Sequence, residues 1–373
     1  MSSSDSLNKK AWARFKRNKS AMIGFALIAV CTLIAVFAYQ ITPDSTPDAN
    51  EQILELETHP PGFKIDMLAV KKERSENSGN AINSFFFGTT SAYYYVPIIG
   101  YKISGDDIKA TAYKGANFAS EEKAISKNSV LTDKSGNPEI ITKRFLLGTD
   151  RFGRDILSRL ILGVRVSLFV GMVAVLISLL IGIVLGAFSG FFGGWIDEAI
   201  MWLINVFWAI PTLLLAMGLY VGVGGLIESK LLLIFIAVGL TMWVDVARLV
   251  RGQFILLREM EFVTAATSMG FSNIRTIFKH ILPNAMGPII VVACSNFANA
   301  ILVESGLSFI GLGIQPPAPS WGGMLNEYRD FIDSDKAFLA LSPGIAIMLL
   351  VLAFNLVGNG LRDALDVKGK SSE

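Results

Sequence analysis

Long apolar runs alternate with short polar segments along most of the chain. A helix that crosses the hydrocarbon core of a membrane needs about 20 mainly apolar residues. We predict six such helices, at residues 21–41, 166–188, 198–220, 231–250, 285–312 and 338–360. The pattern therefore predicts an all-α integral membrane protein. Because the first run exceeds the ~7–15 apolar residues of a signal peptide, we expect it to remain as an uncleaved transmembrane helix.

One long segment, residues 42–147, interrupts this pattern. It opens with proline and acidic residues and continues with aromatic and β-branched runs such as NSFFFGTTSAYYYVPIIGYKI, which turn signals divide. We predict a small β-rich extracytoplasmic insert here. The predicted organisation is a cytoplasmic amphipathic segment at 1–20, a first transmembrane helix at 21–41, the insert at 42–147, a core of five transmembrane helices at 148–366 and a cytoplasmic tail at 367–373.

Composition supports a membrane protein and excludes several kinds of site. The chain is 52% hydrophobic and 17% charged, whereas soluble domains average about 25% charged residues. A net charge of +2 is too small to indicate a nucleic-acid partner. Cys31 and Cys294 both fall in apolar runs, and His59 and His280 are the only histidines. We therefore expect no disulfide framework and no metal site.

The placement of basic residues predicts the orientation in the membrane. Lysine and arginine gather within residues 9–19, 248–279 and 362–370, and such residues favour the cytoplasmic side. Both termini are therefore predicted to be cytoplasmic. The basic residues between 143 and 165 end a long external loop, and long loops largely escape this rule. Trp12 and Phe15 form an apolar edge predicted to lie on lipid at the inner membrane surface, the alternative being a flexible basic tail.

A polar segment between the fourth and fifth predicted spans, EFVTAATSMGFSNIRTIFKHILPN, stands out from its apolar surroundings. Ala265 and Ala266 favour a helix, and Gly270 suits the left-handed position that ends one. Ser272 can cap a second helix, and Pro283 is predicted to end it. Two short helices would then meet at a bend, with small side chains that permit close approach by another protein. An ordinary cytoplasmic loop is the alternative.

This segment resembles a known signature. Glu261, the adjacent alanines, Gly270 and the HILP run from His280 to Pro283 are similar to the EAA signature of permease subunits in binding-protein-dependent ABC importers. The rest resembles the C-type permease of dipeptide/oligopeptide importers, to which nickel permeases are related. The segments that carry this resemblance are AWARFKRNKSAMIG, LLGTDRFGRDILSRLILGVRVSL, VARLVRGQFILLRE, ESGLSFIGLGIQPPAPSWGGML and LALSPGIAIMLLVLAFNLVGNGLRDALD.

The resemblance implies a fold, a function and partners. The expected fold is the six-helix type I ABC importer (MetI-like) fold in a bacterial cytoplasmic membrane, with coupling helices at about 258–283 that dock on an ATP-binding subunit. Expected partners are a homologous permease that forms a heterodimer with this chain, two ATP-binding subunits and an extracytoplasmic solute-binding protein. The chain has no G-x-x-x-x-G-K-[ST] loop, so we expect it to bind no cofactor and its partners to hydrolyse the ATP. Peptides are the expected substrate, with nickel or another small solute as the alternative.

Two further residues are candidates for the pathway or its gate. Glu304 is an intramembrane carboxylate, for which a structural hydrogen-bonded role is the alternative. Pro211 is expected to kink the third span, for gating or for static packing. The run GTDRFGRD is read as a tight turn before the second span, and a substrate site there is less favoured. No nucleophile–base set indicates an enzyme, and no clear repeat indicates an ATP-independent secondary transporter.

Overall fold

The computed structural model describes residues 3–72, 80–115, 121–133 and 137–365. Its contacts divide the chain into two compact units. The first unit comprises residues 1–32, 167–315 and 346–373, and the second comprises residues 33–166 and 316–345. The helices are α1 (Ser3–Arg17), α2 (Lys19–Val36), α3 (Ala38–Ile41), α4 (Ala81–Phe87), α5 (Ile156–Phe192), α6 (Gly194–Trp208), α7 (Thr212–Val223), α8 (Lys230–Arg258), α9 (Glu261–Ser268), α10 (Asn273–Arg275), α11 (Leu282–Phe309), α12 (Trp321–Tyr328) and α13 (Phe338–Leu365).

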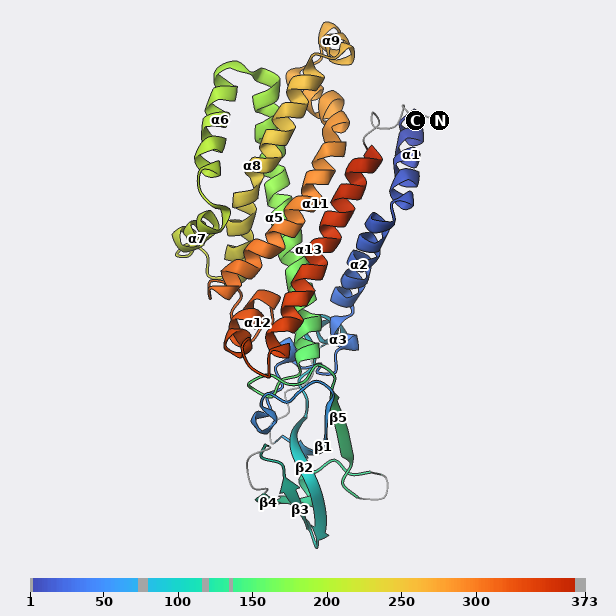
Figure 1. Cartoon of the computed structure of the whole chain (residues 1–373), viewed down its shortest axis with the longest axis vertical. Helices are drawn as coiled ribbons and strands as arrows, with labels where there is room; N and C mark the ends of the chain where they lie inside the picture. Colours follow the sequence, from blue (N-terminus) through green and yellow to red (C-terminus); the bar gives the residue numbers. More distant parts are fainter. Residues whose placement is uncertain (1–2, 73–79, 116–120, 134–136, 366–373) are drawn as a thin grey trace. The chain divides into compact units, whose positions relative to one another are not determined.

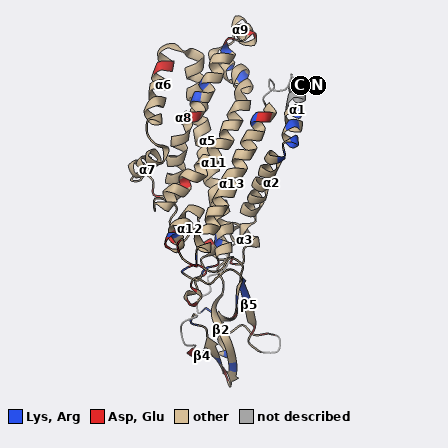
Figure 2. Ribbon diagram, in the orientation of Figure 1, with Lys and Arg blue, Asp and Glu red and all other residues tan. Residues whose placement is uncertain are grey.

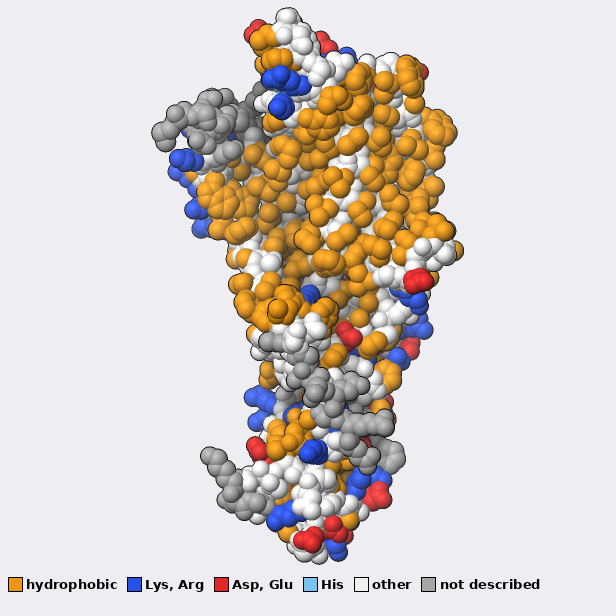
Figure 3. All heavy atoms as spheres, turned by 180° about the vertical axis from the view of Figure 1, so that it is seen from behind, with side chains coloured by type: hydrophobic (Ala, Val, Ile, Leu, Met, Phe, Trp, Pro, Cys, Tyr) orange, Lys and Arg blue, Asp and Glu red, His pale blue; other side chains and the backbone are white. Residues whose placement is uncertain are grey.

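Five of the described helices are long and apolar enough to cross a membrane. They are α2, α5, α8, the continuous helix Asn273–Phe309 and α13. A sixth span exists only if α6 and α7 count as one, because these helices meet at an angle of 96°. The helices expose a nearly continuous hydrophobic surface (Figure 3) and carry few charged side chains along their middles (Figure 2). An α-helical membrane protein with five to six apolar helices is thus confirmed, and the span predicted at 198–220 is the bent pair α6 and α7, broken at the Pro211 where a kink was predicted.

Glycine allows the long helices of the first unit to pack closely. Gly182, Gly186 and Gly190 recur every fourth residue along one face of α5. A Cβ atom at Gly182 would lie 2.7 Å from the carbonyl oxygen of Trp243, and one at Gly190 would lie 2.6 Å from that of Arg251. Small residues at this spacing let two backbones approach each other within a membrane. The α5–α8 contact therefore depends on the absence of side chains at these positions.

The N-terminal helix differs from its prediction. Phe15 is buried among Ala21, Val357 and Ala364, so it packs on the end of α13 instead of facing lipid. Trp12 stays 47% exposed and stacks on Phe15, with ring centroids 5.6 Å apart. The prediction that both rings form an edge facing lipid is therefore wrong for Phe15. Its ring is covered because α1 ends at Arg17 and the chain turns into α2.

The second unit contains a small antiparallel sheet within the predicted insert. Its strands are β1 (Phe63–Lys71), β2 (Tyr93–Ser104), β3 (Asp107–Ala112), β4 (Glu121–Ser126) and β5 (Ile140–Phe145). They are arranged in the order β4-β3-β2-β1-β5, and β1 pairs with both β2 and β5. One face buries side chains such as Leu68, Val96, Ile98 and Ile108. The position of this sheet outside the membrane stays a prediction.

A buried cluster of charges joins distant parts of the second unit. Arg154 donates hydrogen bonds to Asp150 (Nε to Oδ2, 2.6 Å) and to Glu327 (Nη2 to Oε2, 2.7 Å). The Tyr328 hydroxyl donates to Asp150 at 3.2 Å, and the Arg159 Nη2 lies 3.6 Å from Glu327 Oε2. Burial, reinforced by the Asp150 carboxylate, raises the pKa of Tyr328, so its hydroxyl keeps the proton that it donates. Burial lowers the pKa of Arg154, but the two carboxylates outweigh this effect and raise it.

This cluster explains two differences from the sequence predictions. The tight turn at GTDRFGRD is present, with Thr149 and Asp155 bridged, but it packs against α12 and so belongs with residues 316–345. The second span was predicted at 166–188, whereas α5 begins at Ile156. Arg159 therefore lies inside a helix. It can do so because buried carboxylates, not lipid, surround its guanidinium.

Candidate functional site

The segment from Glu261 to Pro283 forms a bent helical tip beyond α8. Helix α9 follows α8 after a two-residue turn, and the chain then bends into α10 and the π-helical turn η4 (Thr276–Ile281). The described ends of α1 and α13 lie at the same end of the first unit as α9 (Figure 1). Two short helices that meet at a bend were predicted here, and the structure contains the bend and the first short helix, α9.

Glycine and serine set the angle of the bend. Gly270 has φ +78°, a left-handed conformation that residues with a Cβ rarely adopt. Its N–H donates to the Thr267 carbonyl at 2.9 Å, and the Phe271 N–H donates to the Ala266 carbonyl at 3.2 Å. These two bonds are those of a Schellman motif, which satisfies the last carbonyls of α9. Ser272 then caps the next helix by accepting from the Arg275 N–H at 3.4 Å.

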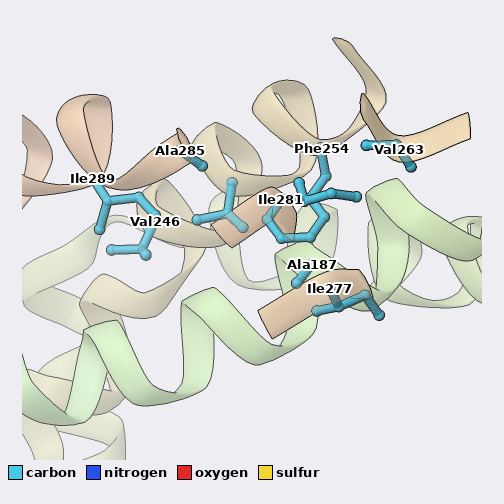
Figure 4. Packing of buried hydrophobic residues seen from close by; sticks show 9 residues of the cluster. Ala187, Val246, Phe254, Val263, Ile277, Ile281, Ala285 and Ile289 are labelled. Carbon is cyan, nitrogen blue, oxygen red and sulfur yellow. The ribbon is translucent and has the colours of Figure 1, made fainter. Parts of the chain in front are cut away.

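Apolar anchors hold the tip on the transmembrane helices. Val263, Ile277 and Ile281 are all buried, and they pack with Phe254 and Ala187 (Figure 4). The anchors come from both sides of the Gly270 bend, while Phe254 and Ala187 come from α8 and α5. Because both arms of the bend rest on one core, the tip is positioned by the spans beneath it.

Aromatic stacking braces the bend, a feature that the sequence analysis missed. The Phe271 ring stacks on His280 with centroids 5.4 Å apart, and the Arg275 guanidinium carbon lies 4.0 Å from the Phe271 ring centroid. Among the described residues, the buried His280 Nε2 atom has no hydrogen-bond partner. His280 therefore contributes to this segment through its ring surface. A basic residue four positions after an aromatic one was the signal available in the sequence.

The prediction that Pro283 ends the second helix is wrong. The helix continues from Asn273 to Phe309, with Pro283 in the first turn of α11. Proline lacks an N–H group, and its ring clashes with the carbonyl four residues earlier in a regular α-helix. The π-helical turn at Thr276–Ile281 widens the helix just before Pro283 and accommodates both effects.

The small side chains that were expected to face a partner protein are only partly exposed. Glu261, Ala265 and Gly270 are exposed, whereas Ala266 is 1% exposed and faces the core. Large apolar side chains share the exposed face, namely Phe262 at 39%, Met269 at 66%, Ile274 at 53% and Phe278 at 40%. We call these four residues the apolar tip. Such a group on a short, braced element is typical of a surface that binds another protein.

Two arginines on α8 link the base of the tip to the turn between α5 and α6. Arg251 forms a bidentate ion pair with Asp197, at 2.6 and 2.7 Å. The Arg258 Nη1 atom donates to the carbonyls of Gly190 and Phe191 at 3.3 and 3.4 Å, where α5 ends. These residues are seven apart and so share one face of α8. A shift of the tip would therefore be transmitted to α5 and α6 as well as along α8.

The two candidate pathway residues lie away from the tip. Pro211 precedes α7 at the break between α6 and α7, so the predicted kink is present and sharp. Glu304 is buried in α11, where its Oε1 accepts from the Ser308 hydroxyl at 2.7 Å. This contact favours the hydrogen-bonded role for Glu304. Among the described residues, no three His, Cys, Asp or Glu side chains gather as metal ligands.

Comparison with known proteins identifies the class. The family described as "Binding-protein-dependent transport system inner membrane component" matches residues 182–368, and "N-terminal TM domain of oligopeptide transport permease C" matches residues 6–61. The dipeptide transport system permease protein DppC of Alkalihalophilus pseudofirmus is 47% identical over 224 residues, which cover 60% of this chain and 72% of that protein. The glutathione transport system permease protein GsiD of Pectobacterium atrosepticum is 42% identical over 226 residues, covering 60% and 73%.

A solved structure also matches. The methionine ABC transporter MetNI, in inward-facing conformations, aligns with a TM-score of 0.46 and 17% identity, over 56% of this chain and 96% of that one. The sequence matches define the chain as a membrane component of a transport system. It belongs to the binding-protein-dependent transport system inner membrane component family. The resemblance to permeases of this kind is thus confirmed.

Proposed function

We propose that this permease subunit imports peptides and that a separate ATP-binding subunit docks on the tip formed by residues 261–283. The observation that carries the proposal is the apolar tip, which is exposed although the segment beneath it is anchored in the core. Transport of short peptides is supported by the names of the relatives, which are permeases for dipeptides and for glutathione. ATP binding and hydrolysis are assigned to the partner subunits, and this chain is proposed to bind no cofactor.

The proposed complex has four kinds of component. This chain forms a heterodimer with a homologous permease, and each of the two permeases contacts one ATP-binding subunit. An extracytoplasmic binding protein delivers the peptide. Purification through this chain in mild detergent, followed by reconstitution, tests the proposal. We expect an ATPase and a second permease to co-purify, and uptake of dialanine to require both ATP and the binding protein. Uptake without ATP would instead favour a secondary transporter.

Orientation can be tested by labelling. We propose that α1, the tip and the end of α13 face the cytoplasm, because basic residues gather there and because the three lie at one end of the unit (Figure 1). Cysteines are introduced at Ser268, on the exposed end of α9, and at Ser104, at the exposed end of strand β2. The background lacks Cys31 and Cys294. In intact cells an impermeant maleimide is expected to label only position 104, and labelling of position 268 before permeabilisation would reverse the orientation.

The sheet of the second unit is proposed to receive the binding protein on the extracytoplasmic side. Its two ends meet, since the Gly62 N–H donates to the Phe145 carbonyl at 2.8 Å and Phe63 pairs with Phe145. The preceding residues, 43–62, belong to the base of this unit, because the Thr58 N–H donates to the Asp150 carbonyl at 2.9 Å. A short linker can therefore replace residues 64–144 and keep the chain on both sides of the sheet, while α4, whose Phe85 and Phe86 carbonyls accept from Gln40 and Arg165, is removed with it.

Excision of the sheet is expected to impair delivery and not assembly. With residues 64–144 replaced by a Gly/Ser linker, the ATPase should co-purify at wild-type yield, because the tip is unchanged. Stimulation of ATP hydrolysis by the loaded binding protein should fall severalfold. As a matched control, only residues 114–120, which connect β3 to β4, are replaced by a Gly/Ser linker of the same length. Wild-type stimulation after full excision would exclude the docking role, and loss of assembly would show that the sheet is a structural brace.

A further inference from the structure

An exposed acidic side chain lies on α8, the most deeply buried of the long apolar helices, toward the inner end of the span predicted at 231–250. Asp245 is exposed, whereas residues 241–244, 246 and 247 of the same helix are buried. Among the described residues, its carboxylate has no hydrogen bond or ion pair. A carboxylate that faces hydrocarbon is unfavourable, so charged residues in spans usually face a water-filled path or a partner. This face of α8 is therefore turned away from lipid.

A basic group lies one turn further along the same helix. Arg248 follows Asp245 by three residues, a spacing that places two side chains next to each other, with Cβ atoms about 5–6 Å apart. Its guanidinium carbon lies 3.9 Å from the centroid of the Trp208 ring. Stacking of this kind orients the planar guanidinium and leaves its N–H groups at the edge for an anion. Opposite charges are thus presented side by side and interact electrostatically, without a direct hydrogen bond or salt bridge between them.

The same point coincides with the break in the third span. Trp208 is the last residue of α6 and is 63% exposed. Residues 208–212 are all exposed, although the Trp208 ring contacts Arg248 of α8. Breaks in spans are tolerated where they line a cavity, and substrate sites of transporters are often built beside them. Arg248 and Trp208 are therefore in contact beside the break, and Asp245 lies one turn away on the same helix.

We propose that Asp245 and Arg248 form a subsite for the zwitterionic backbone of a short peptide in the translocation pathway. Asp245 binds the terminal ammonium group, Arg248 binds the terminal carboxylate through its guanidinium fork, and Trp208 forms an apolar wall for a side chain. The terminal charges of a dipeptide are separated by the ~3.8 Å between its two Cα atoms plus one bond at each end, which suits neighbouring side chains on a helix. This inference rests on the proposed function, because it takes peptides as the cargo.

Accessibility gives the first test. Gly252 lies seven residues after Asp245 and so on the same face of α8. Beyond its own helical neighbours, no described atom lies within 4 Å of a Cβ built there. The assembled importer carrying Gly252→Cys, and lacking Cys31 and Cys294, is treated with a charged methanethiosulfonate reagent. We expect rapid labelling, slowed severalfold by dialanine and not by N-acetyl-dialanine amide, which lacks both charges. A cysteine at Leu352, on the exposed apolar face of α13, should stay unreactive.

Two outcomes would overturn the subsite. An unreactive Gly252→Cys would mean that the partner permease or lipid covers this face, and equal slowing by both peptides would mean that the charges are not recognised. The proposed function is tested separately by ATP-driven dialanine uptake in the cysteine-free parent. If that uptake is present while position 252 is unreactive, only the subsite is wrong; if it is absent, peptide transport itself is wrong.

Substitution gives the second test. Asp245→Asn is expected to lower dialanine uptake about tenfold, the effect of losing one hydrogen bond to a charged group, and to abolish protection of Gly252→Cys. Asp245→Glu should restore most of the uptake, which a purely structural role would not predict. Glu198→Gln, which removes an exposed carboxylate from α6, should leave uptake unchanged. Equal uptake by Asp245→Asn and Glu198→Gln would contradict the assignment of Asp245.

Discussion

Replacement of Gly270 by valine is expected to reduce ATP-driven peptide uptake about tenfold or more. The native φ of +78° is left-handed, and a β-branched residue strongly resists that region. The left-handed conformation costs an ordinary residue about 1–2 kcal/mol, and tenfold corresponds to about 1.4 kcal/mol. The chain should relieve this strain by opening the Schellman motif. Met269 and Ile274, which flank the bend, would then leave the positions at which the ATPase is proposed to bind.

The local structure allows a clean control for this effect. Apart from its two chain neighbours, no described residue has an atom within 4 Å of a Cβ placed at Gly270, so the change to valine acts through the backbone. Asparagine tolerates the left-handed region much better than valine. Gly270→Asn should therefore retain most of the uptake, while both variants insert into the membrane. Near-normal uptake by Gly270→Val would exclude this bend from coupling.

Loss of Arg154 is expected to have the largest effect on stability. Arg154→Gln leaves the carboxylates of Asp150 and Glu327 buried without their strongest partner. Breaking a buried ion pair by removing one member typically costs about 3–5 kcal/mol. For a unit of this size we expect the apparent Tm in detergent to fall by roughly 10 °C. Thermal unfolding followed by size-exclusion chromatography measures the change.

Arg151 supplies the matched control for that experiment. It belongs to the same turn as Arg154 but is exposed, and its guanidinium rests over the Phe152 ring, 4.8 Å from the centroid. Exposed charges contribute little to stability, so Arg151→Gln should change Tm by no more than a degree or two. Equal Tm values for the two variants would show that the buried cluster does not hold the second unit together.

Local rules predicted the bend because its chemistry is local. A glycine after a helical run and a serine two residues later determine the motif through hydrogen bonds between near neighbours, as the contacts of Gly270 and Ser272 confirm. Pro283 was misjudged for a non-local reason. The same rule that forbids proline inside an α-helix is satisfied here by a π-helical turn, whose position depends on how Ile277 and Ile281 pack in the core.

Contacts between distant residues could not be predicted from one sequence. Arg154 and Glu327 are 173 positions apart, so nothing near GTDRFGRD indicated the partner that draws α12 into the second unit. Ala265 and Ala266 looked equivalent because helix propensity does not say which face is buried. The structure distinguishes them through Val263, which is buried with Ala266 and directs that face of α9 inward. Burial and long-range pairing therefore depend on the whole fold, whereas the ends of helices are determined by residues close to them in the sequence.

Cross-linking from the tip tests the central claim most directly. Ala265→Cys is placed in the cysteine-free background, since Ala265 is exposed beside the apolar tip, and the purified importer is treated with a short thiol-reactive photo-cross-linker. We predict a cross-link from position 265 to the ATP-binding subunit whose yield changes when ATP is added, and none to it from a cysteine at Ser104 in the sheet. A fully active importer in which position 265 never cross-links to the ATPase would contradict the assignment of residues 261–283 as the coupling segment.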